Sequence, residues 1–359
     1  MRKLALLLGS LVVVASASAK EVVPAPVVVE EAPVQIVEKE VIVYRDKEEG
    51  FRPNGYVDLQ YRYYGDTEGQ KEEKELVPTA WNKKNNHSRI QLLGKINMTE
   101  NQALEYRTRV FNDLDKEKGL QNGDASTATR LRYFYNHGNL GDSKVNLTSR
   151  VHFNDDGGSQ ELEYQARFNF AEYMFNNDFV KTTNFTVAPK YAYSWDDDNS
   201  SDYDNQLGVD LYSFYELPLG FSAELNVYAT QHFFGKGAEI DVKDGKEDKN
   251  FTVSVEAYLY HTLPLYQNDK LSIAFNNEGG FDTWDWSKEK EFDGTKEADD
   301  TTYQAYLLST IGVDYQATPN VTLYAAAGAE YRNWAITSEN SASNWRWQPT
   351  AWAGFKTTF

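Results

Sequence analysis

From Gly55 to Phe359, apolar and polar residues alternate in segments of about ten residues, and a turn-rich segment follows each. Because successive side chains of a strand point to opposite faces, each segment predicts a strand with one apolar and one polar face. The first segment sets Val57, Leu59, Tyr61 and Tyr63 against Asp58, Gln60 and Arg62. Arginine and glutamate at strand centres require water on one face, whereas the inner face of a soluble sandwich is dry and apolar. The pattern therefore predicts an all-β transmembrane antiparallel barrel.

Fourteen such strands are expected, at 55–64, 88–98, 102–111, 127–136, 144–153, 161–172, 183–195, 205–216, 221–233, 250–261, 270–283, 301–316, 320–333 and 347–359. Their connections alternate between short turns and longer, more acidic loops, which is typical of barrels with periplasmic turns and extracellular loops. Six turns and seven loops join fourteen strands and leave both barrel ends in the periplasm. A count of sixteen stays open, because residues 271–316 could be divided to add a hairpin.

The beginning of the chain has the pattern of a secretory signal peptide. Two basic residues precede an apolar run from Leu4 to Val14, and small residues end at Ala19. This order predicts a signal peptide over residues 1–19, cleaved between Ala19 and Lys20. Residues 20–54, rich in proline, valine and glutamate, predict a periplasmic linker, and residues 55–359 the barrel domain.

Composition agrees with this assignment and excludes some functions. The formal net charge of −18 argues against nucleic acid as a partner. The chain has no cysteine and 24 tyrosines, so we expect no disulfides and bands of aromatic side chains at the two membrane interfaces. The expected location is the outer membrane, among its lipids and lipopolysaccharide, and no cofactor is expected.

Alternation also assigns charged residues to the pore. The basic set lies on the first six strands and is Arg62, Arg89, Arg107, Arg109, Arg130, Arg132, Arg150 and Arg167. The acidic set is Asp58, Glu105, Glu163, Asp210, Glu224, Glu256, Asp314 and Glu330. Since the two sets are concentrated in different halves of the strand order, we expect a basic wall opposite a more acidic one, with a transverse field between them. The alternative is that each arginine pairs with a nearby carboxylate, namely Asp58, Glu105, Glu161 or Glu163.

The last strand alternates up to a terminal Phe359, which resembles the assembly signal of bacterial outer-membrane proteins and implies recognition by the barrel assembly machinery. Small residues dominate the apolar face of the last two strands. The lipid-facing set there is Val321, Leu323, Ala325, Ala327, Ala329, Ala351 and Ala353, of which the five alanines are small. Because small residues permit close approach of backbones, this face is a candidate contact between subunits.

The chain resembles the fusobacterial major outer-membrane porin family (FomA-type). The resemblance rests on the linker Glu38 to Asp46, the segment Gly50 to Asp58 and the C-terminal Ala353 to Phe359. It implies an abundant general diffusion porin that assembles as a homotrimer. It also implies an alternative role as an adhesin, in which extracellular loops bind host or bacterial surface partners.

The sequence predicts no catalytic site and no metal site. A lipid-facing hydrolase needs serine and histidine on the same face of the barrel, but alternation places Ser149 and His152 on opposite faces. The acidic run Asp196 to Asn199 lacks the glycine and the closing glutamate of a calcium loop.

Overall fold

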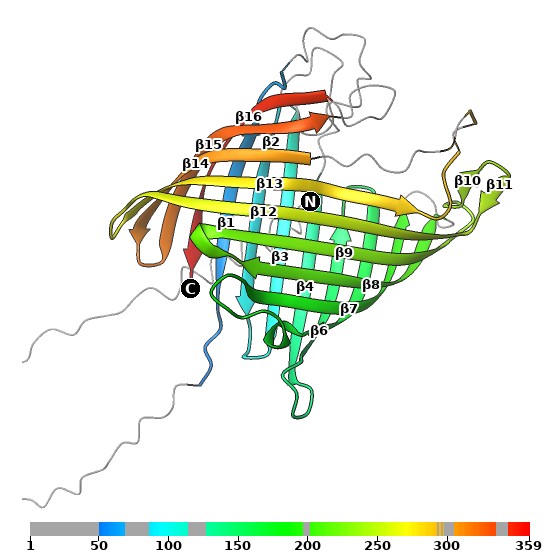
Figure 1. Ribbon diagram of the computed structural model, residues 1–359, viewed down its shortest axis with the longest axis horizontal. Coiled ribbons are helices and arrows are strands. Elements are labelled where there is room, and N and C mark those ends of the chain that lie inside the picture. The colour runs from blue at the N-terminus through cyan, green and yellow to red at the C-terminus, as the bar shows by residue number, and fades with distance from the viewer. Residues whose placement is uncertain are drawn as a thin grey trace, which may run out of the picture. The chain divides into compact units, whose positions relative to one another are not determined.

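In the computed structural model, fourteen antiparallel strands form one closed barrel (Figure 1). The structure describes residues 50–68, 86–113, 127–196, 202–292, 294–295, 297, 305–334 and 344–359. The prediction of fourteen barrel strands is confirmed, and the alternative of sixteen is wrong. No helix in these ranges is long and apolar enough to cross a membrane.

The barrel strands are β1 (Asn54–Tyr64), β2 (His87–Asn97), β3 (Gln102–Asp113), β4 (Thr127–Asn139), β5 (Asn146–Asp155), β6 (Ser159–Asn169), β7 (Lys181–Asp196), β8 (Tyr203–Glu216), β9 (Phe221–Phe234), β12 (Lys249–Gln267), β13 (Leu271–Ser287), β14 (Ala305–Thr318), β15 (Val321–Trp334) and β16 (Asn344–Thr358). Two short strands, β10 (Ile240–Val242) and β11 (Gly245–Glu247), form a separate hairpin in the connection after β9. Two 3-10 turns, η2 (Ala171–Tyr173) and η3 (Pro218–Gly220), lie in short connections at the opposite end.

The barrel closes where β1 pairs with β16, from Tyr56 opposite Thr358 to Tyr64 opposite Thr350. Both ends of the barrel sequence therefore lie at one rim, together with the short connections. We call this rim the turn end and the other the loop end. Closure removes the free sheet edges that would otherwise leave backbone groups without hydrogen bonds in lipid.

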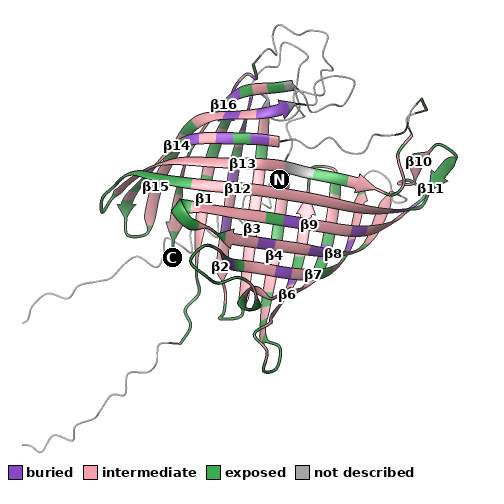
Figure 2. Ribbon diagram, in the orientation of Figure 1, coloured by how far each residue is buried: buried purple, intermediate pink, exposed green. Residues whose placement is uncertain are grey.

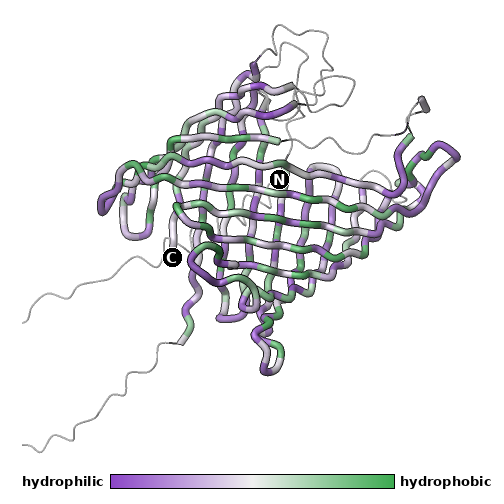
Figure 3. Tube along the Cα trace, viewed as in Figure 1, coloured by the Kyte–Doolittle hydropathy of each residue, from purple (hydrophilic) through white to green (hydrophobic). Residues whose placement is uncertain are grey.

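Each strand presents one face to the interior and one to the outside. In Figure 2 buried and exposed positions are interspersed among intermediate ones along the strands, and in Figure 3 hydrophilic and hydrophobic positions follow one another along the same strands. Shielded side chains on the strands include Gln165, Asp210 and Gln348, whereas apolar Leu162, Leu207 and Ile311 are about half exposed. A closed sheet that shields polar groups and exposes apolar ones has its water-facing surface inside.

Aromatic side chains cluster on the outer face near the loop end. Tyr331 packs against Trp345 and Trp347, with ring centroids 5.0 and 4.7 Å away. Tyr193 stacks on Trp195 at 5.5 Å at the loop end of β7. Aromatic rings of this kind prefer the headgroup depth of a bilayer. They mark one edge of the apolar band that lipid would cover.

Opposite walls follow from the strand order. In a ring of fourteen strands, the strand seven places away lies on the far side. Counting around the ring, β1 faces β8, β2 faces β9, β3 faces β12 and β4 faces β13. This relation determines which interior side chains face each other across the barrel.

Candidate functional site

The interior surface of the barrel is the candidate site, and all sixteen charged residues predicted for it lie on the barrel strands. The pairing registers place them on the same face as the shielded polar residues. Arg62, for example, lies opposite Arg89, and Glu105 lies opposite Arg132. Antiparallel residues directly opposite each other point to the same side of the sheet, so the set is continuous around the ring.

Six of the eight arginines form a continuous basic surface, which we call the arginine wall. It consists of Arg62, Arg89, Arg107, Arg109, Arg130 and Arg132, on β1–β4. Arg62 is the direct cross-strand neighbour of Arg89, and Arg107 that of Arg130. Like charges in direct cross-strand positions repel, so this grouping is unfavourable for the fold itself.

No member of the arginine wall has a carboxylate within ion-pair distance among the described residues. Their contacts are with neutral groups: Arg109 Nε donates to Gln91 Oε1 at 2.7 Å, and Arg62 Nε donates to Thr350 Oγ1 at 3.3 Å. The Arg62 guanidinium also lies 4.6 Å from the ring centroid of Trp352. Glu105, which lies opposite Arg132 in the register, pairs with Lys95 at 3.4 Å instead. Within the part of the chain that the structure describes, no ion pair neutralises the positive charge of the wall.

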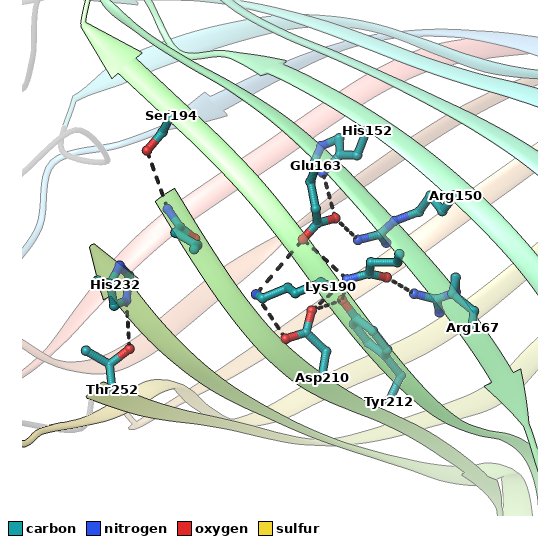
Figure 4. A network of polar contacts seen from close by, with 12 residues as sticks. Arg150, His152, Glu163, Arg167, Lys190, Ser194, Asp210, Tyr212, His232 and Thr252 are labelled. Atoms are coloured by element: carbon teal, nitrogen blue, oxygen red, sulfur yellow. Dashed lines mark hydrogen bonds and ion pairs between the residues drawn. The ribbon is translucent and has the colours of Figure 1, made fainter. Parts of the chain in front are cut away.

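The other two predicted arginines belong to a shielded network on β5–β8 (Figure 4). Arg150 Nη2 donates to Glu163 Oε1 at 2.6 Å, and each side chain is only 7% exposed. Lys190 Nζ lies 3.0 Å from Asp210 and 4.0 Å from Glu163. Arg167 Nη1 donates to Gln165 Oε1 at 2.6 Å. Arg150 and Lys190 are therefore compensated by Glu163 and Asp210, as the pairing alternative expects for Arg150, whereas Arg167 has only neutral partners among the described contacts.

The network reaches across one strand, a contact that a concave surface favours because its side chains converge. Gln165 of β6 donates through Nε2 to Asp210 Oδ2 of β8 at 2.7 Å, passing over fully buried Ala188 of β7. At the barrel seam, Tyr324 of β15 likewise donates to Asp58 of β1 at 2.5 Å. Between them lies Gly354, where a Cβ would stand 2.5 Å from the Tyr324 hydroxyl. Both contacts identify this face as the interior.

Carboxylates on the wall opposite the arginines are held by neutral donors. Tyr260 donates to Glu224 at 3.0 Å, and Tyr228 donates to Glu256 at 2.8 Å. Tyr306 donates to Glu278, a residue absent from the predicted set. None of the three glutamates has a lysine or arginine within ion-pair distance in the described ranges. By the seven-strand rule, β9, β12 and β13 face β2, β3 and β4.

The remaining acidic predictions have different surroundings. Glu330 is buried and pairs with Arg332 at 2.6 Å, so it is neutralised within its own strand. Asp314 lies exposed near the turn end of β14. Phe359 follows the last residue of β16 and is 44% exposed. The predicted cleavage site Ala19–Lys20 lies outside the described residues.

Sequence reasoning missed the interior tyrosines, Lys190 and Glu278. The tyrosines were assigned to the interface bands because composition alone does not separate the two uses. The sequence did contain a signal for two of them. Tyr258 and Tyr260 follow Glu256 at intervals of two residues on one strand, so all three side chains lie on the same, polar face.

One contact on the outer face was also missed. His137 Nε2 lies 2.8 Å from Ser149 Oγ, and the Tyr164 hydroxyl lies 3.0 Å from the same oxygen. The sequence had been tested for Ser149 with His152, which does face the interior and contacts Glu163 at 3.6 Å. Among the described residues no side chain holds the other nitrogen of His137, so the orienting group of a triad is missing there.

Apolar outside, charged inside and closed without an edge, the barrel is an outer-membrane β-barrel. No protein-family model matches the sequence, and no curated protein matches it. Among solved structures the chain is similar to the NanC porin, at 9% identity over 84% of this chain and 98% of that one, with a TM-score of 0.34. It is similar to the outer-membrane channel DcaP of Acinetobacter baumannii, at 9% identity over 86% and 96% of the chains, with a TM-score of 0.35. It is also similar to a bacterial polysaccharide outer-membrane secretin, at 12% identity over 85% and 97%, with a TM-score of 0.38.

Proposed function

We propose that the protein is a general diffusion porin: a water-filled channel for passive passage of ions and small hydrophilic solutes. The observation that supports it is the unneutralised charge on the interior surface. Six arginines on β1–β4 and three glutamates on β9, β12 and β13 lack an ion-pair partner among the described residues. An unpaired charge in a dry interior costs several kcal/mol. Nine of them require water along this interior.

Strand number agrees with this proposal. Eight-stranded barrels fill their interior with side chains, whereas barrels of 16–18 strands leave an aqueous channel. Fourteen strands lie near the open end of that range. No catalytic residue, cofactor or metal is assigned to the proposed function.

The test is conductance in a planar lipid bilayer. The purified, folded barrel is added to one side in potassium chloride, and the current is recorded at fixed voltage. We expect discrete upward steps of uniform size, and no steps from the same preparation after heat denaturation. A folded barrel that inserts, as shown by protease protection in vesicles, yet passes no current would refute the channel.

The charge arrangement supports a transverse field within the channel. The arginine wall is positive, and Glu224, Glu256 and Glu278 make the opposite wall negative. A solute that crosses such a pore is oriented by the field as well as selected by size. The acidic connections at the loop end oppose the arginines, so the sign of the net selectivity is left to measurement.

We further propose a homotrimer that contacts its neighbours through the alanine patch, defined as Ala325, Ala327, Ala329, Ala351 and Ala353. Ala325 lies opposite Ala353, and Ala327 opposite Ala351, so the patch is continuous across β15 and β16. It offers little apolar bulk to lipid but lets a neighbouring barrel approach closely. Outer-membrane lipid and lipopolysaccharide would cover the rest of the outer face.

An adhesin role, carried by extracellular connections, is the second candidate. The β10–β11 hairpin supports it, because an ordered and highly charged element extends from the loop end beyond the barrel. Replacing residues 236–248 with a short glycine–serine turn separates the two roles. If the hairpin binds host or bacterial surfaces, adhesion falls while the conductance steps persist. The resemblance to the FomA-type family would accommodate both roles.

A further inference from the structure

The interior wall of β9, β12 and β13 combines aromatic rings with carboxylates at one place. We define this aromatic–carboxylate wall as Glu224, Glu256, Tyr258, Tyr260 and Glu278. Tyr258 lies directly opposite Glu224 of β9, and Tyr260 directly opposite Glu278 of β13. Glu256 follows on the same face of β12, two residues before Tyr258. Each of the two rings on β12 therefore has a carboxylate as its direct neighbour on an adjacent strand.

The rings form a continuous row. The Tyr260 ring centroid lies 6.3 Å from that of Phe214 and 6.2 Å from that of Tyr258. Tyr258 in turn lies 6.3 Å from Tyr306. The residue between Tyr258 and Tyr306 in the register is Gly280, at φ 154°, where an added Cβ would stand 2.1 Å from the Ala257 carbonyl oxygen. The backbone conformation at Gly280 therefore leaves no room for a side chain at this position beside the rings.

Two of the carboxylates on this wall can accept further hydrogen bonds. Glu256 accepts from Tyr228 and Asn226 through Oε2, and Glu278 accepts from Tyr306 through Oε1. No described residue donates to Glu256 Oε1 or Glu278 Oε2. Neither oxygen is among the buried atoms left without a partner, so both are open to water. Each presents a negative oxygen to the lumen beside a ring.

The same combination holds a cation elsewhere in this barrel. Arg332 lies 4.6 Å from the Tyr306 ring centroid and donates to Glu330 at 2.6 Å. Lys190 lies 6.0 Å from the Tyr228 ring centroid and pairs with Asp210 at 3.0 Å. In both cases a tyrosine face and a carboxylate share one cationic group. Tyr260 likewise lies beside a carboxylate, that of Glu224, but no described lysine or arginine lies over its ring.

We propose that the aromatic–carboxylate wall is a binding site for organic cations, meaning solutes that carry an ammonium or guanidinium group on an apolar stem. The inference rests on the proposed channel and names a solute class for it. The rings contact the stem and attract the cation through their faces, and the carboxylates supply charge-assisted hydrogen bonds. The arginine wall opposite repels the same solute, which keeps it against β9, β12 and β13.

The test uses ethylguanidinium and its uncharged isostere ethylurea as probes of the potassium chloride current. In the intact protein, millimolar ethylguanidinium should reduce the conductance in a saturable way, and ethylurea should leave it unchanged. Tyr260→Leu removes the ring, and we expect a half-blocking concentration about 2–5-fold higher, the size of one exposed cation–π contact. Tyr260→Phe keeps the ring and should stay within about twofold of the unmodified protein.

The carboxylate arm uses the double variant Glu224→Gln with Glu278→Gln, which keeps shape and removes two charges. It should weaken block about tenfold or more, by loss of two charge-assisted contacts. Retained heat-modifiable migration shows that each variant folds. A channel that conducts but does not distinguish ethylguanidinium from ethylurea overturns the inference and leaves the proposed function intact. Block that is insensitive to Tyr260→Leu also overturns it, since charge alone would then explain the effect. Absence of current in every variant, including the unmodified protein, instead refutes the channel.

Discussion

Removing four charges from the arginine wall should change ion selectivity by an amount that can be calculated. The variant is Arg107→Gln, Arg109→Gln, Arg130→Gln and Arg132→Gln together. These side chains are adjacent on β3 and β4, and no described carboxylate neutralises them. Glutamine keeps polar length and hydrogen-bonding capacity, so the interior surface stays hydrated while its charge falls.

The expected magnitude follows from Coulomb's law in a water-filled pore. One charge about 10 Å from a monovalent ion contributes about 0.4 kcal/mol in water, reduced by screening to about 0.15 kcal/mol at 0.1 M salt. Four arginines therefore contribute about 0.6 kcal/mol, close to the thermal energy. Cations gain and anions lose by about a factor of three each, so the cation-to-anion permeability ratio should rise ~8-fold.

Salt dependence makes the prediction sharper. At 1 M the screening length falls to about 3 Å, and the same calculation gives a change of only about 1.2-fold. The assay is the reversal potential across a bilayer in a twofold salt gradient, measured around 0.1 M and again around 1 M. A pore effect of this origin must appear at low salt and nearly vanish at high salt.

A matched control removes the same formal charge from the loop end. Lys236→Gln, Lys243→Gln, Lys246→Gln and Lys288→Gln lie in or beside the connections after β9 and β13, outside the barrel strands. This variant should shift the permeability ratio by less than about twofold, because exposed charges at the mouth are screened by bulk salt. If the arginine variant changes selectivity no more than the lysine variant does, the arginines do not line the conducting path.

Three further outcomes test other parts of the account. Deleting Phe359 should reduce the heat-modifiable, protease-resistant form in outer membranes, and normal assembly of the deletion would show that the terminal residue is dispensable. Ala327→Cys should crosslink between subunits under mild oxidation, whereas a bulky thiol label that leaves the oligomer intact would place the interface elsewhere. Glu163→Gln should destabilise the folded barrel by about 3–5 kcal/mol in urea unfolding, because Arg150 is left buried without its carboxylate. Glu216→Gln, which breaks the exposed pair with Lys181, is the control and should cost less than about 1 kcal/mol.

Strand positions and the interior face could be predicted because both depend on local alternation. Arg132, for instance, lies between Leu131 and Tyr133. In a closed transmembrane barrel the polar face of such a strand can only face the interior. Most predicted strand bounds lie within a few residues of the observed ones, and the largest differences are extensions such as β12, which runs to Gln267. When a strand extends beyond the segment that faces the membrane, it gains backbone hydrogen bonds. The apolar–polar alternation within the segment, from which the strand was predicted, stays the same.

Alternation fails where a strand bulges. Between Phe281 and Trp284 the pairing of β13 with β12 slips, so that Ala257 faces Phe281 and Val255 faces Trp284. Both of these β13 residues occupy the outer side although their numbers differ in parity. Asp285 consequently shares the interior face with Glu278 and is hydrogen-bonded by Ser254. A bulge adds residues to one strand only, and no strict period-two count can anticipate it.

Pairing partners could not be predicted, because they depend on register and not on alternation. The sequence offered Asp58, Glu105, Glu161 and Glu163 as partners for the arginines. Of these four, only Glu163 forms an ion pair with a predicted arginine among the described residues. Asp58 instead accepts from Tyr324 across the barrel seam, a contact between residues at opposite ends of the barrel sequence. Such contacts exist only after closure, so local sequence carries no signal for them.

Closure also decides what the charges face, and this depends on the number of strands. With fourteen strands, half a turn is seven strands. Arg132 of β4 therefore lies across the lumen from β13, the strand that carries Glu278. With sixteen, half a turn would be eight strands and every pairing would shift by one strand, so that β9 would face β1 and β13 would face β3, and Arg132 of β4 would no longer lie opposite Glu278. The arginine wall and the aromatic–carboxylate wall lie in separate parts of the sequence, with no local pattern linking them. Strand count therefore determines the transverse field, and composition only supplies the charges that the closed ring then places against each other.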